Sequence, residues 1–527
     1  MQENNKKNGL DTFDHVVVLM LENRSFDNLL GYLYEEGVPP GKQFEGLQDK
    51  VIEMPVPERA IDYKEHKTVQ PHKAKDYHQP YPDPGEVYQH VNTQLYNFIN
   101  EKNIGVDAGK MAPPYNIPNP QPETPSMKGF VNDYINTLQA LDGKEGSKYN
   151  NPDFSKYSIV MQCYKPDQVN VLATLAKEFA VFDHWYCSVP SQTWCNRAFW
   201  HAGTSGGKVV NPLGEGSAID SMEAMASWIE HVWDKKTLFH QMAENNISYA
   251  VYKGDIVSLT GLIHDPFKVD NPFYDKGTIK RYTDFENDIN NGKLPQYSFI
   301  EPKFLLEHND QHPSSVDSTL FGRTKCGTVF LGEKLILDVY NTIKNSDQYR
   351  DKTLFIITHD EHGGCFDHVV PHSPVPPPEK GMTGEKGFTF NRLGIRVPMV
   401  MVSAYIQKNT IENNIFEHSS FIKTMCDKWG LEGLTERDKK AQSFEAVFSK
   451  QKRDFPELEP ITIDPTCADE SDFPLNELQR SILNAAHYTA KQKQGLTVTQ
   501  ADAVVVANIK TIGEAMAHLE SIRIYLK

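Results

Sequence analysis

The 527-residue sequence has few cysteines and no long apolar run. Its seven cysteines stand singly, without a Cys-x-x-Cys pair, which is not the pattern of a disulfide framework or a zinc knuckle. Residues 1–15 contain no apolar run, and the run at 16–21 is too short for the core of an export signal or for a membrane span. We therefore expect a soluble chain, cytoplasmic as the sequence stands, or secreted if an export signal was removed or lies outside it.

Positive charge is also scarce. The chain carries 54 Lys and Arg against 70 Asp and Glu, which gives a formal net charge of −16. Such a field opposes long-range attraction to nucleic acid or to anionic membranes, so we expect no nucleic-acid partner. Hydrophobic residues make up 39% of the chain, which is ordinary for a globular protein and enough for a large core.

Short apolar runs alternate with amphipathic stretches along most of the chain. This alternation predicts an α/β fold, in which helices cover both faces of a mostly parallel sheet. Helical patterns occur at 168–178 and 331–343. The strand-like runs lie at 15–21, 179–182, 248–252, 353–358 and 397–403.

Two regions depart from this alternation. Residues 39–130 are rich in Pro, Tyr and charge, which predicts an ordered, loop-rich insertion. From residue 436 the pattern is helical and polar, with amphipathic segments at 475–492 and 511–526. We therefore predict a catalytic domain at 1–435 and a mainly helical C-terminal region at 436–527.

Oxygen-bearing side chains follow two of the predicted strands. Glu22 and Asn23 come directly after the run at 16–21, and Asp360 and Glu361 follow the strand at 353–358. Ligands of open α/β sheets bind beyond the carboxyl ends of the strands, and carboxylates crowded there repel one another unless a cation lies between them. The alternative is that Glu22 and Asp360 cap helices and pair with basic side chains.

A third stretch, 179–207, continues from a strand into a loop that carries hydroxyl groups and Arg197. A hydroxyl beside a divalent cation loses its proton more easily and can attack phosphorus. The guanidinium of Arg197 has the planar shape that binds two phosphate oxygens. The three stretches together indicate phosphoryl transfer.

Five motifs of the chain resemble, in the same order, those of the phospholipase C / acid phosphatase superfamily. This is the phosphoesterase family of bacterial phospholipases C and plant non-specific phospholipases C. The resemblance implies an alkaline-phosphatase-like α/β core and metal-assisted hydrolysis of phosphate esters through a covalent intermediate. The motifs are LENRSFDNLLGYL (21–33), SVPSQTWCNR (188–197), FIEP (299–302), NDQHPSS (309–315) and THDEHGG (358–364).

The resemblance assigns roles to individual residues. Glu22 and Asn23 match one pair of metal ligands, and Asp360 and Glu361 match the other. Thr193 matches the nucleophile, which also binds the metal. One divalent ion is therefore expected, and Ca²⁺, Mg²⁺, Mn²⁺ and Zn²⁺ remain open as its identity.

Further roles follow from the same resemblance and from the loops that carry the residues. His312 matches a histidine near the leaving group, and His264 lies in another segment that matches the family's active site. Asn196 or Arg197 is expected to hold a non-bridging phosphate oxygen.

The sequence departs from the family at two places. The usual Gly-Pro-Thr/Ser-x-Pro segment reads SQTWC at 191–195, which leaves Ser191 as a rival nucleophile. Many relatives have DPGH where this chain has DPGEVYQH at 83–90. Glu86 stands at the position of that histidine, and His90 is a candidate to substitute for it.

Three functions remain open at this point. The first is a phospholipase C that cleaves glycerophospholipids to diacylglycerol and a phosphorylated head group through a phosphothreonine intermediate. The second is a broad-specificity acid phosphomonoesterase, and the third is an inactive lipid-binding or interaction protein with the same fold. The expected partners are a phospholipid or a small phosphate ester and, transiently, a membrane or micelle surface, while the oligomeric state stays open.

Overall fold

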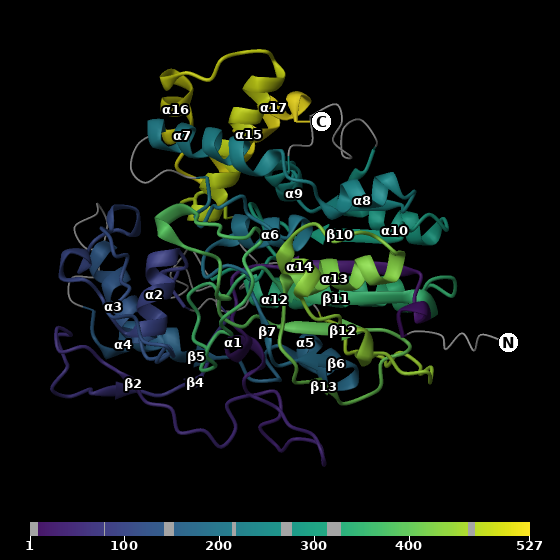
Figure 1. The fold of residues 1–527 in the computed structure, drawn as a ribbon, viewed down its shortest axis with the longest axis horizontal. Coiled ribbons are helices and arrows are strands. Elements are labelled where there is room, and N and C mark those ends of the chain that lie inside the picture. Colours follow the sequence, from purple (N-terminus) through teal and green to yellow (C-terminus); the bar gives the residue numbers. More distant parts are fainter. Residues whose placement is uncertain are drawn as a thin grey trace.

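The computed structural model describes residues 9–77, 80–141, 152–212, 218–264, 277–313, 328–461 and 470–526. Its centre is an eight-stranded sheet (Figure 1) with the strand order β13-β6-β12-β11-β1-β10-β8-β9. All neighbours pair in parallel except β12, which is antiparallel to β11 and β6. The strands are β1 (His15–Leu21), β6 (Ala180–Phe182), β8 (Tyr249–Lys253), β9 (Ile279–Arg281), β10 (Tyr297–Glu301), β11 (Thr353–His359), β12 (Met399–Val402) and β13 (Thr410–Glu412).

Strand β1 lies in the middle of the sheet, between β10 and β11. Val16 pairs with Tyr297 on one side and with Leu354 on the other. The six residues 16–21 are completely buried, because helices cover both faces of the sheet. A strand that is buried on both faces needs apolar side chains at every position. This burial explains why the run does not alternate with polar residues.

Helices pack on both faces of the sheet. Helices α6 and α13 contact each other on one face, and α5 and α12 contact each other on the opposite face (Figure 1). The described α-helices are α1 (Phe26–Leu30), α2 (Tyr88–Tyr96), α3 (Phe130–Leu141), α4 (Phe154–Tyr157), α5 (Asn170–Glu178), α6 (Thr193–Ala202), α7 (Ala218–Trp228), α8 (Leu238–Glu244), α9 (Leu259–Ile263), α10 (Thr283–Asn290), α12 (Thr328–Lys344), α13 (His418–Trp429), α14 (Glu436–Lys440), α15 (Glu477–Lys493), α16 (Gln500–Ala507) and α17 (Ile512–Ile522).

The predicted insertion at 39–130 lies beside the sheet, on the left of Figure 1. Its regular elements are short, apart from α2, and it packs with α3 around a hydrophobic cluster of its own that includes Val91, Leu95 and Phe130. Within it β2 (Met54–Pro55) pairs with β3 (Thr68–Val69), and its β4 (His72–Lys73) pairs with β5 (Gln162–Cys163) from outside the insertion. Two more short strands, β7 (Trp185–Tyr186) and β14 (Phe416–Glu417), pair near the sheet.

The C-terminal helices α15, α16 and α17 gather with α7 at one end of the molecule (Figure 1). The stretch before them behaves differently, because α14 packs on α13, and Phe444 and Val447 belong to the core around the sheet. The stretch from α14 to Val447 is therefore part of the core around the sheet, and the separate group of C-terminal helices begins with α15. The division at 435/436 stays a prediction.

The predicted α/β class is confirmed, and each predicted strand and helix coincides with an observed one to within a few residues. The runs at 179–182 and 397–403 correspond to β6 and β12, and the pattern at 331–343 lies inside α12. Strands β9, β10 and β13 were not predicted. In the described part of the chain, no helix combines the length and the apolar character needed to cross a bilayer.

Candidate active site

The carboxyl ends of β1 and β11 bring the two predicted ligand pairs together. Leu21 pairs with His359, so Glu22 and Asp360 leave neighbouring strands at the same level. The backbone N–H of Asn23 donates to Asp360 Oδ1 at 3.1 Å, and the N–H of Glu361 donates to the same oxygen at 2.8 Å. All four side chains are buried.

The turn after β1 requires an unusual backbone. Asn23 has a φ of 54°, in the left-handed region that asparagine tolerates better than most residues. Gly363 packs against it, and a Cβ at Gly363 would lie 2.1 Å from the carbonyl oxygen of Asn23. The glycine of the HGG motif therefore lets the two ligand-bearing turns approach each other.

Thr193 is the first residue of α6, and its hydroxyl faces these carboxylates. Its Oγ1 donates to Glu22 Oε2 at 3.0 Å and lies 3.4 Å from Asn23 Oδ1. The rival candidate, Ser191, instead donates its hydroxyl hydrogen to the backbone carbonyl of Val209. The geometry thus favours Thr193, whose position at a helix N-terminus also suits an anionic ligand.

Arg197 lies one helical turn beyond Thr193 and pairs with the same carboxylate. Its Nε donates to Glu22 Oε1 at 2.9 Å and lies 3.8 Å from Asp360 Oδ2, while Nη2 donates to the carbonyl of Met20 at 3.0 Å. Burial alone would lower the pKa of Arg197, but Glu22 and Asp360 outweigh it and raise the pKa. Its Nη1 makes no hydrogen bond to any described residue.

Asn196 has a different set of partners from the one that its predicted role requires. Its Oδ1 accepts from the N–H of Val189 at 2.9 Å, and its Nδ2 lies within 3.2 Å of the carbonyls of Val189, Ser191 and Gln192. The amide therefore braces the loop that leads to Thr193. These contacts leave Arg197 as the candidate for binding a phosphate oxygen.

The carboxylates crowd one another in a buried space. Burial, followed by Asp360, raises the pKa of Glu361, and burial outweighs Arg197 to raise the pKa of Glu22. Asp360 Oδ2 and Glu361 Oε1 accept no hydrogen bond from any described residue, although both are buried. Carboxylate, amide and hydroxyl oxygens with unused acceptors fit a hard divalent cation, so the predicted ligands suit the predicted ion.

His312 lies on the other side of Asn23. Its Nε2 is 3.1 Å from Asn23 Nδ2 and 3.7 Å from Asp83 Oδ2, and its Nδ1 is 2.9 Å from the carbonyl of Pro313. This pattern assigns the hydrogen to Nδ1 and leaves Nε2 as an acceptor for the amide of Asn23.

Two acidic residues of the insertion also reach the site, and neither was among the predicted site residues. Glu86 accepts a hydrogen bond from Asn23 Nδ2, and Asp83 lies beside His312. The departure from the family's DPGH motif was the available signal, because it placed a carboxylate where relatives have a histidine. His90 does not take that place, since its Nδ1 pairs at 2.7 Å with Asp133 of α3.

The structure does not bring His264 to this group of residues. Its ring lies edge-on to His201, with 5.8 Å between the ring centroids. His201 is eight residues after Thr193 on α6, about 12 Å along the helix axis. Burial lowers the pKa of His264 to about 3, so the ring is neutral at ordinary pH.

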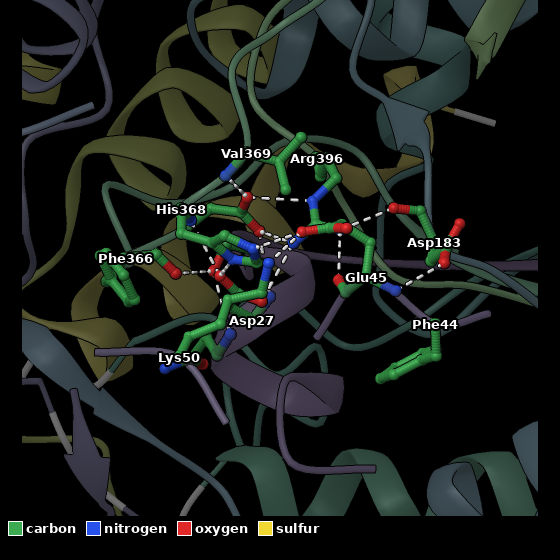
Figure 2. A network of polar contacts seen from close by, with 12 residues as sticks. Asp27, Phe44, Glu45, Lys50, Asp183, Phe366, His368, Val369 and Arg396 are labelled. Atoms are coloured by element: carbon green, nitrogen blue, oxygen red, sulfur yellow. Dashed lines mark hydrogen bonds and ion pairs between the residues drawn. The ribbon is translucent and has the colours of Figure 1, made fainter. Parts of the chain in front are cut away.

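A buried charge network joins the segments that follow the two ligand pairs (Figure 2). We call Asp27, Asp367, His368 and Arg396 the Arg396 cluster. Arg396 donates to Asp27 Oδ1 and to Asp367 Oδ1, both at 3.0 Å, and its Nη1 donates to the carbonyls of Glu45 and Asp183. Asp27 and Asp367 lie a few residues after Asn23 and Glu361, so the cluster fixes these two turns relative to each other.

The C-terminal helix α15 packs against the first turn of α6, where Thr193 lies. Trp194, next to Thr193, donates from Nε1 to Ser481 Oγ at 3.0 Å. Burial raises the pKa of Glu477, the first residue of α15, although Gln192, on the other side of Thr193, acts to lower it. The C-terminal region therefore contacts Trp194, next to Thr193.

A cavity of about 1170 Å³ opens beyond the carboxyl ends of β8, β9 and β10. Glu301 lines this cavity and is one of the carboxylates that raise the pKa of Arg197. Apolar side chains form part of its wall: Ile256, Val257, Leu262, Ile279, Leu306 and Leu335.

Sequence comparison identifies the family. A model of the Phosphoesterase family matches residues 13–432, which include every group of the acidic site. The chain belongs to the phosphoesterase family. The predicted membership, and with it the prediction of a phosphoric ester hydrolase, is confirmed.

This phosphoesterase is 31% identical to non-specific phospholipase C6 of Arabidopsis thaliana over 452 residues, which cover 82% of this chain and 72% of the relative. Phospholipase C B of Mycobacterium tuberculosis is 25% identical over 309 residues, covering 52% and 53%. Among solved structures, a protein in the alkaline phosphatase superfamily from Vibrio parahaemolyticus matches with a TM-score of 0.30 and 15% identity, over 54% of this chain and 67% of that one.

Proposed function

We propose that this phosphoesterase is a phospholipase C that cleaves glycerophospholipids to diacylglycerol and a phosphorylated head group. The observation that carries the proposal is the hydroxyl of Thr193, held at 3.0 Å from Glu22 at the N-terminus of α6 with Arg197 one turn away. A hydroxyl, a carboxylate cluster and a guanidinium form a phosphoryl-transfer site. The relatives named phospholipase C support the choice of substrate.

The site requires one divalent cation in this proposal. Glu22, Asn23, Thr193, Asp360 and Glu361 would hold it, because their oxygens converge on the carboxyl ends of β1 and β11. When bound, the ion would lower the pKa of the Thr193 hydroxyl and neutralise charge on the phosphoryl oxygens.

The chain's own residues perform the first step. The oxygen of Thr193 attacks phosphorus in line with the leaving oxygen and transfers its proton to Glu22 Oε2, which accepts its hydrogen bond in the structure. Arg197 Nη1, which has no partner among the described residues, is the donor for a non-bridging phosphate oxygen. The bond from phosphorus to the alcohol oxygen breaks, and a phosphothreonine forms that water then hydrolyses.

His312 completes the first step by giving a proton to the departing alkoxide. In the structure its Nε2 accepts from the amide of Asn23, so the role requires a second ring proton on Nε2, directed at the leaving oxygen. The departing alcohol is diacylglycerol, and the cavity beyond β8, β9 and β10 offers space for its apolar part. The substrate reaches this site from a membrane or micelle surface during a transient encounter.

The test is product analysis on mixed glycerophospholipid micelles and on p-nitrophenyl phosphate, with and without a metal chelator. We expect diacylglycerol and phosphorylated head groups from the micelles, and loss of both products when the chelator removes the ion. The Thr193→Ala variant is the matched negative control. Hydrolysis of the monoester alone would instead support the phosphomonoesterase, and no hydrolysis of either substrate with any of the four ions would support the inactive binding protein.

A further inference from the structure

Two groups of ligating side chains in the described part of the chain have the spacing of metal sites. One consists of Asp27, Asp367 and His368, and the other of Asp83, Glu86 and His312. Nitrogen donors occupy both. The guanidinium of Arg396 binds the two aspartates of the first group, and the amide Nδ2 of Asn23 lies between Glu86 and His312 in the second.

The second group therefore surrounds the side chain of a proposed metal ligand. The Oε2 atom of Glu86 accepts a hydrogen bond from Asn23 Nδ2, so Glu86 holds the NH₂ end of the amide toward itself. The carbonyl end, Oδ1, then faces Thr193, 3.4 Å from its hydroxyl oxygen. Without Glu86, nothing in this contact would distinguish the two ends of the amide.

Glu86 also reaches the loop of the nucleophile. Its second oxygen, Oε1, accepts from Gln192 Nε2 at 3.2 Å, and Gln192 immediately precedes Thr193. One buried carboxylate thus bridges Asn23 on the turn after β1 and the residue before the nucleophile. Both oxygens of Glu86 are engaged in these two contacts. Its role is therefore to hold the side chains of Asn23 and Gln192.

We propose that Glu86 is a positioning residue of the metal site, which orients the amide oxygen of Asn23 toward the cation and aligns Thr193 through Gln192. The inference rests on the proposed function, because it takes Asn23 as a metal ligand. His312 also contacts the amide, but it must release it to protonate the leaving oxygen. Glu86 has no such second task and holds the amide through the whole reaction.

The experiment measures Mn²⁺ binding by calorimetry to chelator-treated protein and needs no turnover. We expect Glu86→Ala to weaken Mn²⁺ binding by about 10–100-fold, the usual effect of losing a residue that orients a ligand. We then compare Asn23→Ala with the double variant Asn23→Ala/Glu86→Ala. Here the loss of Mn²⁺ affinity caused by Glu86→Ala should be at least tenfold smaller than in the unmodified protein, because no amide is left to orient. Loss of a nearby negative charge acts in both backgrounds, so the comparison separates orientation from charge.

Two more variants sharpen the result. Glu86→Gln keeps an oxygen that accepts from Asn23 and should retain part of the affinity, and it replaces Glu86→Ala if that variant does not fold. His90→Gln is the matched control, because His90 lies in the same segment, is buried and pairs with Asp133. Its Mn²⁺ affinity should equal that of the unmodified protein.

The failures are distinguishable. One case is that Asn23→Ala alone weakens Mn²⁺ binding, as the proposed ligand set requires. In that case, equal weakening by Glu86→Ala in both backgrounds, or no weakening in either, would overturn the positioning role of Glu86. If Asn23→Ala itself leaves Mn²⁺ binding unchanged, the proposed ligand set is wrong, and the proposed metal site falls together with the inference.

Discussion

The histidine of the Arg396 cluster makes the stability of the fold depend on pH. Burial alone would lower the pKa of His368, but the carboxylate of Asp27 and hydrogen bonds to Asp27 and Glu45 raise it from 6.5 to about 9. Since the folded chain binds this proton more tightly than the unfolded chain, the stabilisation is complete below pH 6.5. It is lost as the pH rises through about 9.

The size of the effect follows from the same values. The difference between pH 6.5 and about 9 corresponds to about 3 kcal/mol, at about 1.4 kcal/mol per pH unit. His368 is only 12% exposed, so solvent screens the pair weakly. For a chain of 527 residues, about 3 kcal/mol corresponds to a shift of about 3 °C in Tm.

The assay compares the Tm of the unmodified protein with that of His368→Gln between pH 6 and pH 9.5, at one scan rate. Glutamine does not titrate, so the gap in Tm should shrink by about 3 °C over this range. The His72→Gln variant is the control, because the ring of His72 bonds the backbone carbonyl of Gln70, and its gap should stay constant. A gap for His368→Gln that does not change with pH would refute the reasoning.

Three further predictions concern the site and its support. Thr193→Ala should abolish turnover even at a metal concentration that saturates the four remaining ligands, and acid-quenched unmodified enzyme should carry phosphate on Thr193 by mass spectrometry; phosphate elsewhere, or none, contradicts this. His312→Ala should slow esters with poor leaving groups by about 10²–10⁴ in kcat and barely affect nitrophenyl esters; an equal loss on both rules out the acid role. Arg396→Met leaves Asp367 without its ion-pair partner in the core and leaves Asp27 with His368 alone, so denaturant titration should show a loss of about 3–5 kcal/mol; an unchanged midpoint argues against the cluster.

The strand-end residues were predictable because their pattern is local. A buried parallel strand reads as a continuous apolar run, and Glu22 and Asn23 stand immediately after one. The same reasoning found Asp360 and Glu361. Thr193 needed the order of the motifs as well, because two hydroxyls share its loop and only the structure shows where each one points.

Contacts between distant segments were not predictable. Glu86 reaches the site only because the insertion packs against the turn after β1, and sequence periodicity carries no information on that docking. Arg396 meets Asp27 across 369 positions, and nothing local to either residue indicates the pairing. The catalytic role of His264 rested on a match to a family segment, and the structure places its ring edge-on to His201.

The central position of β1 has a consequence for how the chain is made. This strand leaves the ribosome well before its two neighbours, because Val16 pairs with Tyr297 and Leu354, which follow roughly 280 and 340 positions later. At about 5–20 residues per second, the apolar run at 16–21 waits about 15–70 s for its neighbours. We therefore expect nascent chains stalled near residue 290 to be crosslinked to chaperones through β1, and chains stalled beyond residue 400 to be released from them. Equal crosslinking at both lengths would contradict this dependence on the neighbouring strands.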